Sequence, residues 1–263
     1  PVPAGVGAAT KGTGSEATKN AVLSRHGPDG FKKSFRDNRL VAEVAVVDPS
    51  LLDSCPKTLI AANGMDAFTQ LLESYVSLRA SPFTDALASS GMQAFRDGFW
   101  QAWVAEDPLA QQGYQKIAYA SLCSGITLAQ CGLGSVHGLA SPLGAFFPIP
   151  HGVVCGTLVA AATRVNIDAL RARDPGGIAL RKYAEAGILL SGRMFTSEVA
   201  AQDGLVDLLD QWTARLSLPR LSEFGMAEAD VERVVANSRG GSMQTNPIRL
   251  DDDELANVLR TRL

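Results

Sequence analysis

Helical spacing of apolar residues runs from Pro56 almost to the C-terminus, and it limits the fold of this chain more than any other feature. Between positions 58 and 82 the large apolar side chains recur every three or four residues, which is typical of a helix with a buried face. Later segments carry Ala, Ser and Gly on several faces, which suits helices buried in close contact with others. We expect helices over 58–81, 82–107, 109–132, 151–173, 180–190, 199–216, 228–236 and 252–263. The segment 134–152 is expected to be irregular or a broken helix, because Pro142, Pro148 and Pro150 interrupt it.

The first 50 residues have a different texture, with Gly-rich or polar stretches around two short apolar runs. We predict a strand over Ala21–Leu23, and a buried strand within Val41–Pro49 that ends in a turn at Asp48-Pro49. Two strands cannot bury a sheet by themselves. We therefore interpret residues 1–52 as the end of a larger α/β domain and residues 53–263 as an all-helical domain.

Composition narrows the classes of function. A formal charge of −3 and a pI near 5.7 give no electrostatic reason to expect a nucleic-acid partner. No apolar run approaches the roughly 20 residues that span a bilayer, and no secretory signal begins at Pro1. The four cysteines form no Cys-x-x-Cys pair, so we interpret them as reduced, buried thiols of a cytoplasmic protein.

The chain begins with a near-duplicate, GVGAATK followed by GTGSEATK. Neither copy completes a Rossmann fingerprint or a Walker A loop, because the required later glycine or the Gly-Lys-Ser/Thr ending is missing. In the second copy, glycine amides and the hydroxyls of Thr13, Ser15 and Thr18 could hold a phosphate or a ribose. A flexible glycine turn is the alternative interpretation.

A second set of residues could hold a divalent cation. Asp66 and Gln70 lie four positions apart and so share one face of a helix that is otherwise suited to burial. A buried carboxylate is costly unless it is paired or bound to a cation. With His137 and His151, these side chains form a candidate site for Fe or Zn, whereas purely structural histidines are the alternative.

Several motifs then recur in the order found in one enzyme family: GTGSEAT, AVVDP, GMDAFTQLLESYVS, VHGLASPLGAFFPIPHG and NPIRL. Together they resemble the iron-containing alcohol dehydrogenases, from Gly12 to the C-terminus. The resemblance implies a mainly α chain of dehydroquinate synthase-like architecture, in which a C-terminal helical bundle follows the end of a dinucleotide-binding α/β domain. It also implies an active site in the cleft between the two domains. There a divalent metal, usually iron and sometimes zinc, holds a small alcohol or aldehyde while NAD or NADP exchanges a hydride with it.

The resemblance also assigns residues. Asp66, His137 and His151 match three of the four metal-ligand positions and are the catalytic candidates, and Gln70 stands where the family usually has the fourth ligand, a histidine. Ser141 stands where many members have a second histidine near the nicotinamide. The remaining positions on the cofactor side are Thr13, Ser15, Thr18, Val22 and Lys32.

Two other interpretations remain open at this stage. A maleylacetate reductase-like enzyme would need cationic groups at the cleft, for which Arg79 and Arg96 are not obviously placed. A non-catalytic relative is favoured by Gln70, by Ser141 and by the lack of the family's Gly-Gly-Gly-Ser loop, without which we expect weak binding of NAD(P). In either case the family resemblance predicts a homo-oligomer, most simply a dimer, with no nucleic-acid or membrane partner.

Overall fold

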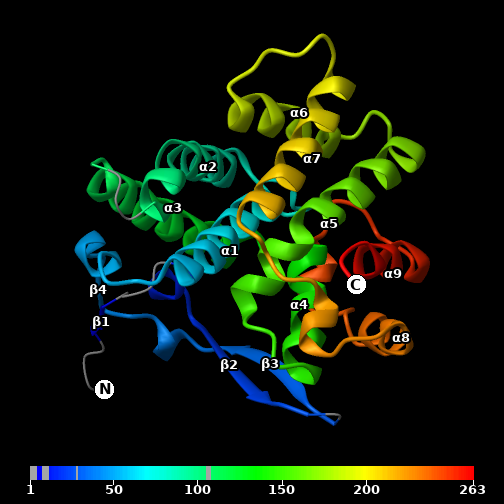
Figure 1. Cartoon of the computed structure of the whole chain (residues 1–263), viewed down its shortest axis with the longest axis horizontal. Helices are drawn as coiled ribbons and strands as arrows, with labels where there is room; N and C mark the ends of the chain where they lie inside the picture. The colour runs from blue at the N-terminus through cyan, green and yellow to red at the C-terminus, as the bar shows by residue number, and fades with distance from the viewer. Residues whose placement is uncertain (1–4, 8–11, 28, 105–107) are drawn as a thin grey trace.

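The computed structural model describes residues 5–7, 12–27, 29–104 and 108–263, and helices make up most of this part of the chain (Figure 1). The long helices are α1 (Lys57–Val76), α2 (Pro82–Trp103), α3 (Ala110–Cys131), α4 (Ser135–Phe146), α5 (His151–Arg173), α6 (Ile178–Ser191) and α7 (Glu198–Arg215). Two shorter ones follow, α8 (Val231–Ala236) and α9 (Asp252–Thr261). A helix is present in each segment predicted from the spacing, which confirms a mainly α chain, although residues 105–107 of the predicted helix 82–107 lie outside the described residues.

Helix α1 lies at the centre of the bundle and contacts α2, α3, α5 and α6. It is buried along most of its length, which explains why its sequence is apolar or small on several faces. Its Phe68 ring packs 5.0 Å from Phe95 of α2 and 5.2 Å from Trp212 of α7, between ring centroids. Aromatic pairs at these separations add to the stability that burial gives. The core therefore holds α1 rigidly between its neighbours.

Capping residues explain where several helices begin. The Ser81 hydroxyl accepts a hydrogen bond from the Thr84 amide, and the Thr84 hydroxyl accepts one from the Ser81 amide, while Pro82 occupies the first turn of α2. The same reciprocal arrangement joins Asp251 and Glu254 at the start of α9. The prediction that α1 ends before Pro82 and that α2 begins there is confirmed.

The prediction of a broken helix over 134–152 is confirmed at Pro148 and Pro150, but Pro142 does not interrupt it. Residues Ser135–Phe146 form one helix, α4, that continues through Pro142. A proline inside a helix costs about 3 kcal/mol, but Leu139, Ala140 and Leu143 are fully buried here, and the burial of such side chains offsets a cost of this size. Only Pro148 and Pro150 interrupt helical structure, in the connection to α5.

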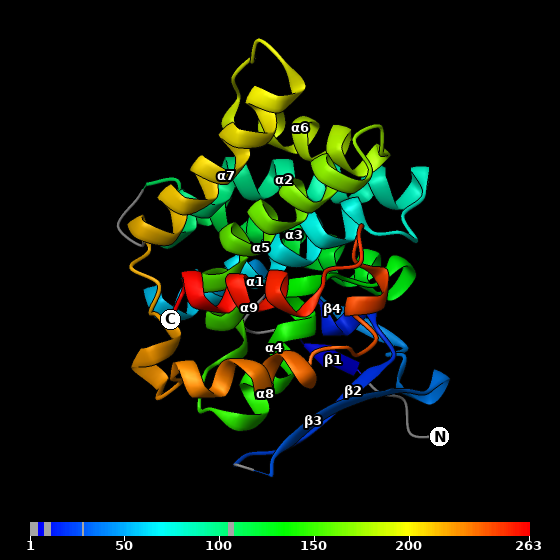
Figure 2. The same ribbon diagram turned by 90° about the vertical axis from the view of Figure 1, so that its right-hand side faces the viewer.

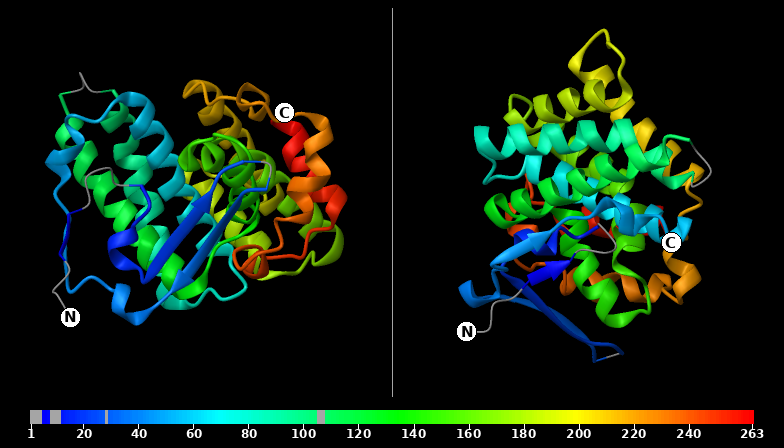
Figure 3. Two further views of the ribbon diagram at one scale, coloured as in Figure 1. Left: turned by 90° about the horizontal axis from the view of Figure 1, so that it is seen from below. Right: turned by 90° about the vertical axis from the view of Figure 1, so that its left-hand side faces the viewer.

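The strands form two separate pairs at one end of the molecule (Figure 2). Strands β2 (Asn20–Arg25) and β3 (Phe31–Arg36) make an antiparallel hairpin, with Ala21 opposite Phe35. Strands β1 (Gly5–Gly7) and β4 (Val44–Val46) pair in parallel. The hairpin crosses the helices on its side of the molecule (Figure 3), and β3 contacts α4. This contact brings the first 50 residues against the helical bundle.

The expected burial of the second apolar run was wrong, although the strand itself is present. Val44 and Val46 of β4 are 60% and 56% exposed. The reason is that β4 pairs only with β1, and nothing else within the described residues covers these side chains. The other exposed large apolar residues of this region are Val22, Leu23, Phe31, Phe35, Leu40 and Val41.

Helix α5 is long and apolar enough to cross a membrane by length and composition alone. Its most apolar stretch is, however, 83% buried inside the protein, as expected for the core helix of a folded bundle. The bent pair of α3 and α4 passes the same test with an angle of 98° between the two helices. The absence of a membrane partner therefore stays a prediction, as does the domain boundary after residue 52.

Candidate metal centre

Three helices bring Asp66 of α1, His137 of α4, and His151 and Cys155 of α5 together, with one potential ligand atom of each within 4.8 Å of the others. His137 Nε2 lies 3.2 Å from Asp66 Oδ1, and His151 Nε2 lies 3.8 Å from the same oxygen. Asp66 is only 1% exposed. A carboxylate this deeply buried needs a compensating positive charge. We call these four residues the ligand cluster.

Glycines on α5 allow this convergence. A Cβ atom on Gly152 would lie 2.5 Å from the carbonyl oxygen of Ala62, in the turn of α1 before Asp66. A Cβ on Gly156 would lie 2.9 Å from the Cβ of Met65. The helices therefore cross with almost no side chain between them. His151 and Cys155, each one position before a glycine, extend from the same region of α5 into the cluster.

Glu73 fixes the orientation of His137, a role that the motifs in the sequence did not reveal. Its Oε2 atom lies 2.6 Å from His137 Nδ1, and its Oε1 atom accepts a 2.7 Å hydrogen bond from the amide of Val136. A carboxylate acceptor at Nδ1 places the ring proton there and leaves Nε2 free to bind a metal. The only available signal was that Glu73 lies seven residues after Asp66, on the same face of the helix.

Asn246, from the NPIRL motif, also binds the start of α4, next to the Val136 amide that Glu73 contacts. Its Oδ1 atom accepts a 2.9 Å hydrogen bond from the Ser135 amide at the start of α4, and its Nδ2 atom donates to Asn166 of α5. All three side chains are buried. The motif thus ties together the two helices that carry the cluster histidines.

The cluster also touches the strand region. Lys32 Nζ of β3 lies 3.3 Å from His151 Nδ1, and the Ser141 hydroxyl donates a 2.8 Å hydrogen bond to the Lys32 carbonyl. Burial lowers the pKa of Lys32, although Cys155 and Asp66 oppose this shift. If His151 binds a metal through Nε2, its ring proton resides on Nδ1, the atom that faces the Lys32 amine.

Burial and neighbouring charges set the two histidines apart. Burial lowers the pKa of His137, but Cys155, Glu73 and Asp66 raise it by more, so it lies well above the usual value. Burial, together with His137 and Lys32, lowers the pKa of His151 to about 4 despite the nearby Asp66. Burial also raises the pKa of the Cys155 thiol to about 12 when no metal is bound. His151 is therefore neutral near pH 7 with a lone pair available.

Gln70, the predicted fourth ligand, is buried on α1 one turn after Asp66. Its Oε1 atom lies 2.9 Å from the Ser124 hydroxyl of α3, a hydrogen-bond distance. The atom with which it would bind a metal is therefore already in contact with a polar group of the protein.

The predicted cofactor-side residues of the first segment lie on the loop before β2 and on β2 itself. The Thr13 and Ser15 hydroxyls are 2.6 Å apart and exposed, whereas Thr18 is buried and donates to the Ser15 carbonyl. Val22 is half exposed. Gly14 has a φ of +58°, and a Cβ there would lie 2.5 Å from Gly125 of α3. Close packing on α3 thus accounts for this glycine, in addition to any ligand.

The sequence of residues 60–263 matches the model of the family described as "Fe-containing alcohol dehydrogenase family, C-terminal". The chain belongs to the iron-containing alcohol dehydrogenase family. The resemblance seen in the ordered motifs is therefore confirmed.

Named relatives agree with this assignment. The 1-propanol dehydrogenase PduQ of Citrobacter freundii is 32% identical over 262 residues, which cover 97% of this chain and 68% of the relative. The NADPH-dependent butanol dehydrogenase of Clostridium saccharobutylicum is 27% identical, covering 95% and 62%. A crystal structure of 1,3-propanediol oxidoreductase superposes with a TM-score of 0.87 at 28% identity, covering 98% of this chain and 65% of that one. The chain thus spans between 62% and 68% of the length of these relatives.

The donor atoms of the ligand cluster fit a divalent metal. Ligand bonds of about 2.0–2.3 Å at tetrahedral angles place ligand atoms roughly 3.3–3.6 Å apart. The distances from Asp66 Oδ1 to the two histidine Nε2 atoms, 3.2 and 3.8 Å, are close to this spacing. The oxygen and nitrogen donors suit both Fe(II) and Zn(II).

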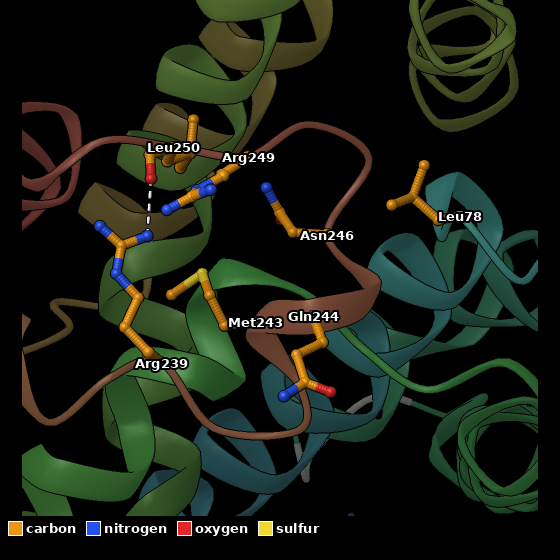
Figure 4. A pocket seen from close by; sticks show the side chains of 7 residues that line it. All are labelled: Leu78, Arg239, Met243, Gln244, Asn246, Arg249 and Leu250. Atoms are coloured by element: carbon orange, nitrogen blue, oxygen red, sulfur yellow. Dashed lines mark hydrogen bonds between the residues drawn. The ribbon is translucent and has the colours of Figure 1, made fainter.

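Another hollow, with a volume of about 280 Å³, is lined by Leu78 and by the segment that leads into α9 (Figure 4). None of the residues that line it belongs to the ligand cluster, although Asn246 is among them. Its Arg239 donates to the Leu250 carbonyl and pairs with Asp252. The positive charge of Arg239 is therefore balanced within the protein. The full set of lining residues is Leu78, Arg239, Met243, Gln244, Asn246, Arg249 and Leu250.

Proposed function

We propose that this chain carries the metal-binding and substrate-binding part of an NAD(P)-dependent alcohol dehydrogenase that interconverts a small alcohol and its aldehyde. The observation that supports it most strongly is the convergence of Asp66, His137 and His151 from three helices, with the His137 ring oriented by Glu73. The names of the relatives, which include 1-propanol and butanol dehydrogenases, support a small alcohol as the substrate.

In this proposal Asp66, His137 and His151 hold Fe(II) or Zn(II). The bound metal supplies a Lewis acid that polarises the oxygen of the alcohol. Asp66 contributes the negative charge that offsets part of the cation charge in a buried site. Glu73 keeps the Nδ1 proton of His137 in place, and this directs the Nε2 lone pair into the cluster. The sequence offers Gln70 as the fourth ligand, but its Oε1 atom lies within hydrogen-bond distance of the Ser124 hydroxyl, so the three other residues carry this proposal.

The cofactor side is proposed to lie where β3 and the loop before β2 meet the helices. A nicotinamide bound there would supply the hydride acceptor for the alcohol. The exposed hydroxyls of Thr13 and Ser15 are proposed to meet the cofactor, together with Thr18, which donates to the Ser15 carbonyl, and with Val22 of β2. Lys32 and Ser141 join this side to His151 through the hydrogen bonds described above.

The alternative with a dicarboxylate substrate gains no support from Arg96. Its guanidinium pairs with Asp97 and donates to the Leu189 carbonyl, so its charge is engaged between α2 and α6. A homodimer in the cytoplasm remains part of the proposal, and sedimentation of the metal-loaded protein would measure its mass.

The three histidines of the chain provide a matched test. We expect alcohol-dependent reduction of NAD or NADP by metal-loaded protein, loss of this activity after treatment with a chelator, and its return when metal is added back. His137→Ala and His151→Ala should abolish turnover because each removes a ligand. His26→Ala should leave turnover unchanged, because His26 is exposed in the turn of the hairpin and does not belong to the ligand cluster.

Circular dichroism of each variant checks that the helices are retained. Turnover that persists in correctly folded His137→Ala and His151→Ala, or that is indifferent to chelation, would refute the metal-assisted reaction.

A further inference from the structure

A centre with three protein ligands leaves a fourth protein position to be accounted for, and Cys155 lies beside it. We propose that Cys155, rather than Gln70, provides the fourth protein ligand, that the alcohol oxygen takes a fifth position on the metal, and that the resulting Asp–His–His–Cys centre prefers Zn(II) to Fe(II). This inference rests on the proposed metal site and specifies its composition.

The position of the Cys155 sulfur supports this assignment. Its Sγ atom lies 3.6 Å from His137 Nε2 and 3.8 Å from His151 Nε2. A sulfur and a nitrogen bound to one tetrahedral zinc ion are about 3.6 Å apart. Both distances from the sulfur are thus close to those expected if Cys155, His137 and His151 bound one zinc ion. Cys155 is also fully buried, so its sulfur faces this cluster and not solvent.

The local geometry of α5 explains why Cys155 reaches the cluster. It follows His151 by one helical turn, and Gly152 and Gly156 occupy the positions that cross α1. The two ligand-bearing positions and the two glycines therefore alternate along one helix. This pattern places the His151 and Cys155 side chains near Asp66, while the glycines leave α1 and α5 in close contact.

Gln70 is the weaker candidate for the same position. Its amide oxygen is uncharged and is within hydrogen-bond distance of the Ser124 hydroxyl. A Cys155 thiolate carries a charge, and with Asp66 it would balance the two positive charges of the metal inside a buried site. When the metal binds, the thiol proton leaves to solvent and the sulfur lone pair forms the new bond.

A thiolate also changes which metal is preferred. Sulfur is a soft donor that favours Zn(II) over Fe(II), whereas a set of oxygen and nitrogen donors alone accommodates Fe(II) as well. We expect the wild-type protein, loaded anaerobically from an equal mixture of Fe(II) and Zn(II), to retain mainly zinc. Cys155→Ser should shift the retained metal toward iron. It should also weaken zinc binding by more than the roughly 10–100-fold that loss of a ligand's hydrogen-bond partner costs.

Cobalt(II) gives a direct reading of the sulfur bond. Titration of metal-free wild-type protein with Co(II) should produce visible absorption from the bound ion and, in the near ultraviolet, the intense charge-transfer band of a cobalt–thiolate bond. Cys155→Ser should lose this band. Cys123→Ser is the matched control, because Cys123 is a buried free thiol of α3 outside the cluster, and it should keep the band. Gln70→Ala should keep it as well.

The outcomes separate this inference from the proposed function. Cobalt that binds the wild type with His137-dependent visible absorption but no thiolate band would overturn Cys155 as a ligand and leave the metal site standing. Loss of cobalt binding in Gln70→Ala with retention in Cys155→Ser would overturn it in favour of Gln70. Failure of wild-type protein to bind any metal would refute the proposed function itself. Should Cys155→Ser fail to fold, X-ray absorption of the zinc-loaded wild type decides, since a zinc–sulfur shell is required.

Discussion

At the scale of single residues, Glu73 binds both the start of helix α4 and the ring of the candidate ligand His137. One carboxylate oxygen accepts from the backbone at the start of α4 and the other binds the His137 ring, so both oxygens of this buried side chain are used. A negative charge at a helix N-terminus is favourable in itself. The same side chain thus stabilises α4 and aims His137.

Glu73→Gln should weaken metal binding by about 10–100-fold, because an amide presents only one acceptor oxygen and cannot serve both partners at once. Competition with a chromophoric chelator measures the change. Glu198→Gln, at an exposed position in the first turn of α7, is the control that should leave the affinity unaltered. Equal affinities for wild type and Glu73→Gln would contradict the role given to this residue.

The raised pKa of His137 predicts how metal affinity depends on pH. Near pH 7 the metal-free protein holds a second proton on this ring, at Nε2, and a metal must displace it before binding. Apparent affinity should therefore increase as the pH rises through the pKa of His137 and decrease as it falls. Isothermal titration calorimetry in buffers of different ionisation enthalpy should report proton release on binding. Binding with no proton release, and equally tight over this range, would show that His137 is not displaced from its protonated state.

At the scale of helices, the crossing of α1 and α5 decides whether the ligand cluster can form. Gly152 allows the backbone of α5 to approach the Ala62 carbonyl, and the two histidine-bearing helices are joined through Asn246 and Asn166. The cluster is therefore a product of close helix packing and not of a flexible loop.

Gly152→Ala should destabilise the protein by about 1–3 kcal/mol, because the new methyl group overpacks this crossing. It should also weaken zinc binding, since Asp66 and His151 would move apart. Urea unfolding and zinc titration measure the two effects. Gly176→Ala is the control, because a Cβ there meets no atom within 4 Å, and it should change neither quantity. A Gly152→Ala variant with wild-type stability and affinity would contradict the close approach.

Lys182 of α6 is a second feature of the bundle with a measurable effect. Its buried ammonium donates to the Tyr75 carbonyl at the end of α1 and to Asp85 of α2. Lys182→Met should cost about 1–3 kcal/mol of unfolding free energy, because it leaves the Tyr75 carbonyl and the partly exposed Asp85 without their partner. Arg181→Ala removes an exposed pair with Glu185 and should cost at most about 1 kcal/mol. Similar losses in the two variants would mean that the Lys182 contacts contribute little.

At the scale of the whole molecule, the helices could be predicted from the sequence because their signals are local. Apolar spacing and proline positions located α1 and α2, and the motifs placed Asp66, His137 and His151 in one family site. Glu73 and Cys155 could not be found in this way. Glu73 meets a ring 64 residues away, and Cys155 joins the cluster only because α5 crosses α1.

Two errors had the same origin in tertiary context. Pro142 was expected to disrupt α4, but the burial of its neighbours offsets the local penalty. The β-branched residues of β4 were expected to be buried, but that depends on a second layer over the strand, which the described residues do not provide. Local sequence predicts an element, whereas its environment depends on what packs against it.

Anomalous diffraction from crystals of the zinc-loaded protein can locate the single divalent metal that we propose to bind between α1, α4 and α5. Data collected on either side of the zinc absorption edge should show a single strong peak per chain, about 2.0–2.2 Å from Asp66 Oδ1, His137 Nε2 and His151 Nε2. A peak at another place, or no peak in protein equilibrated with excess zinc, would contradict the account.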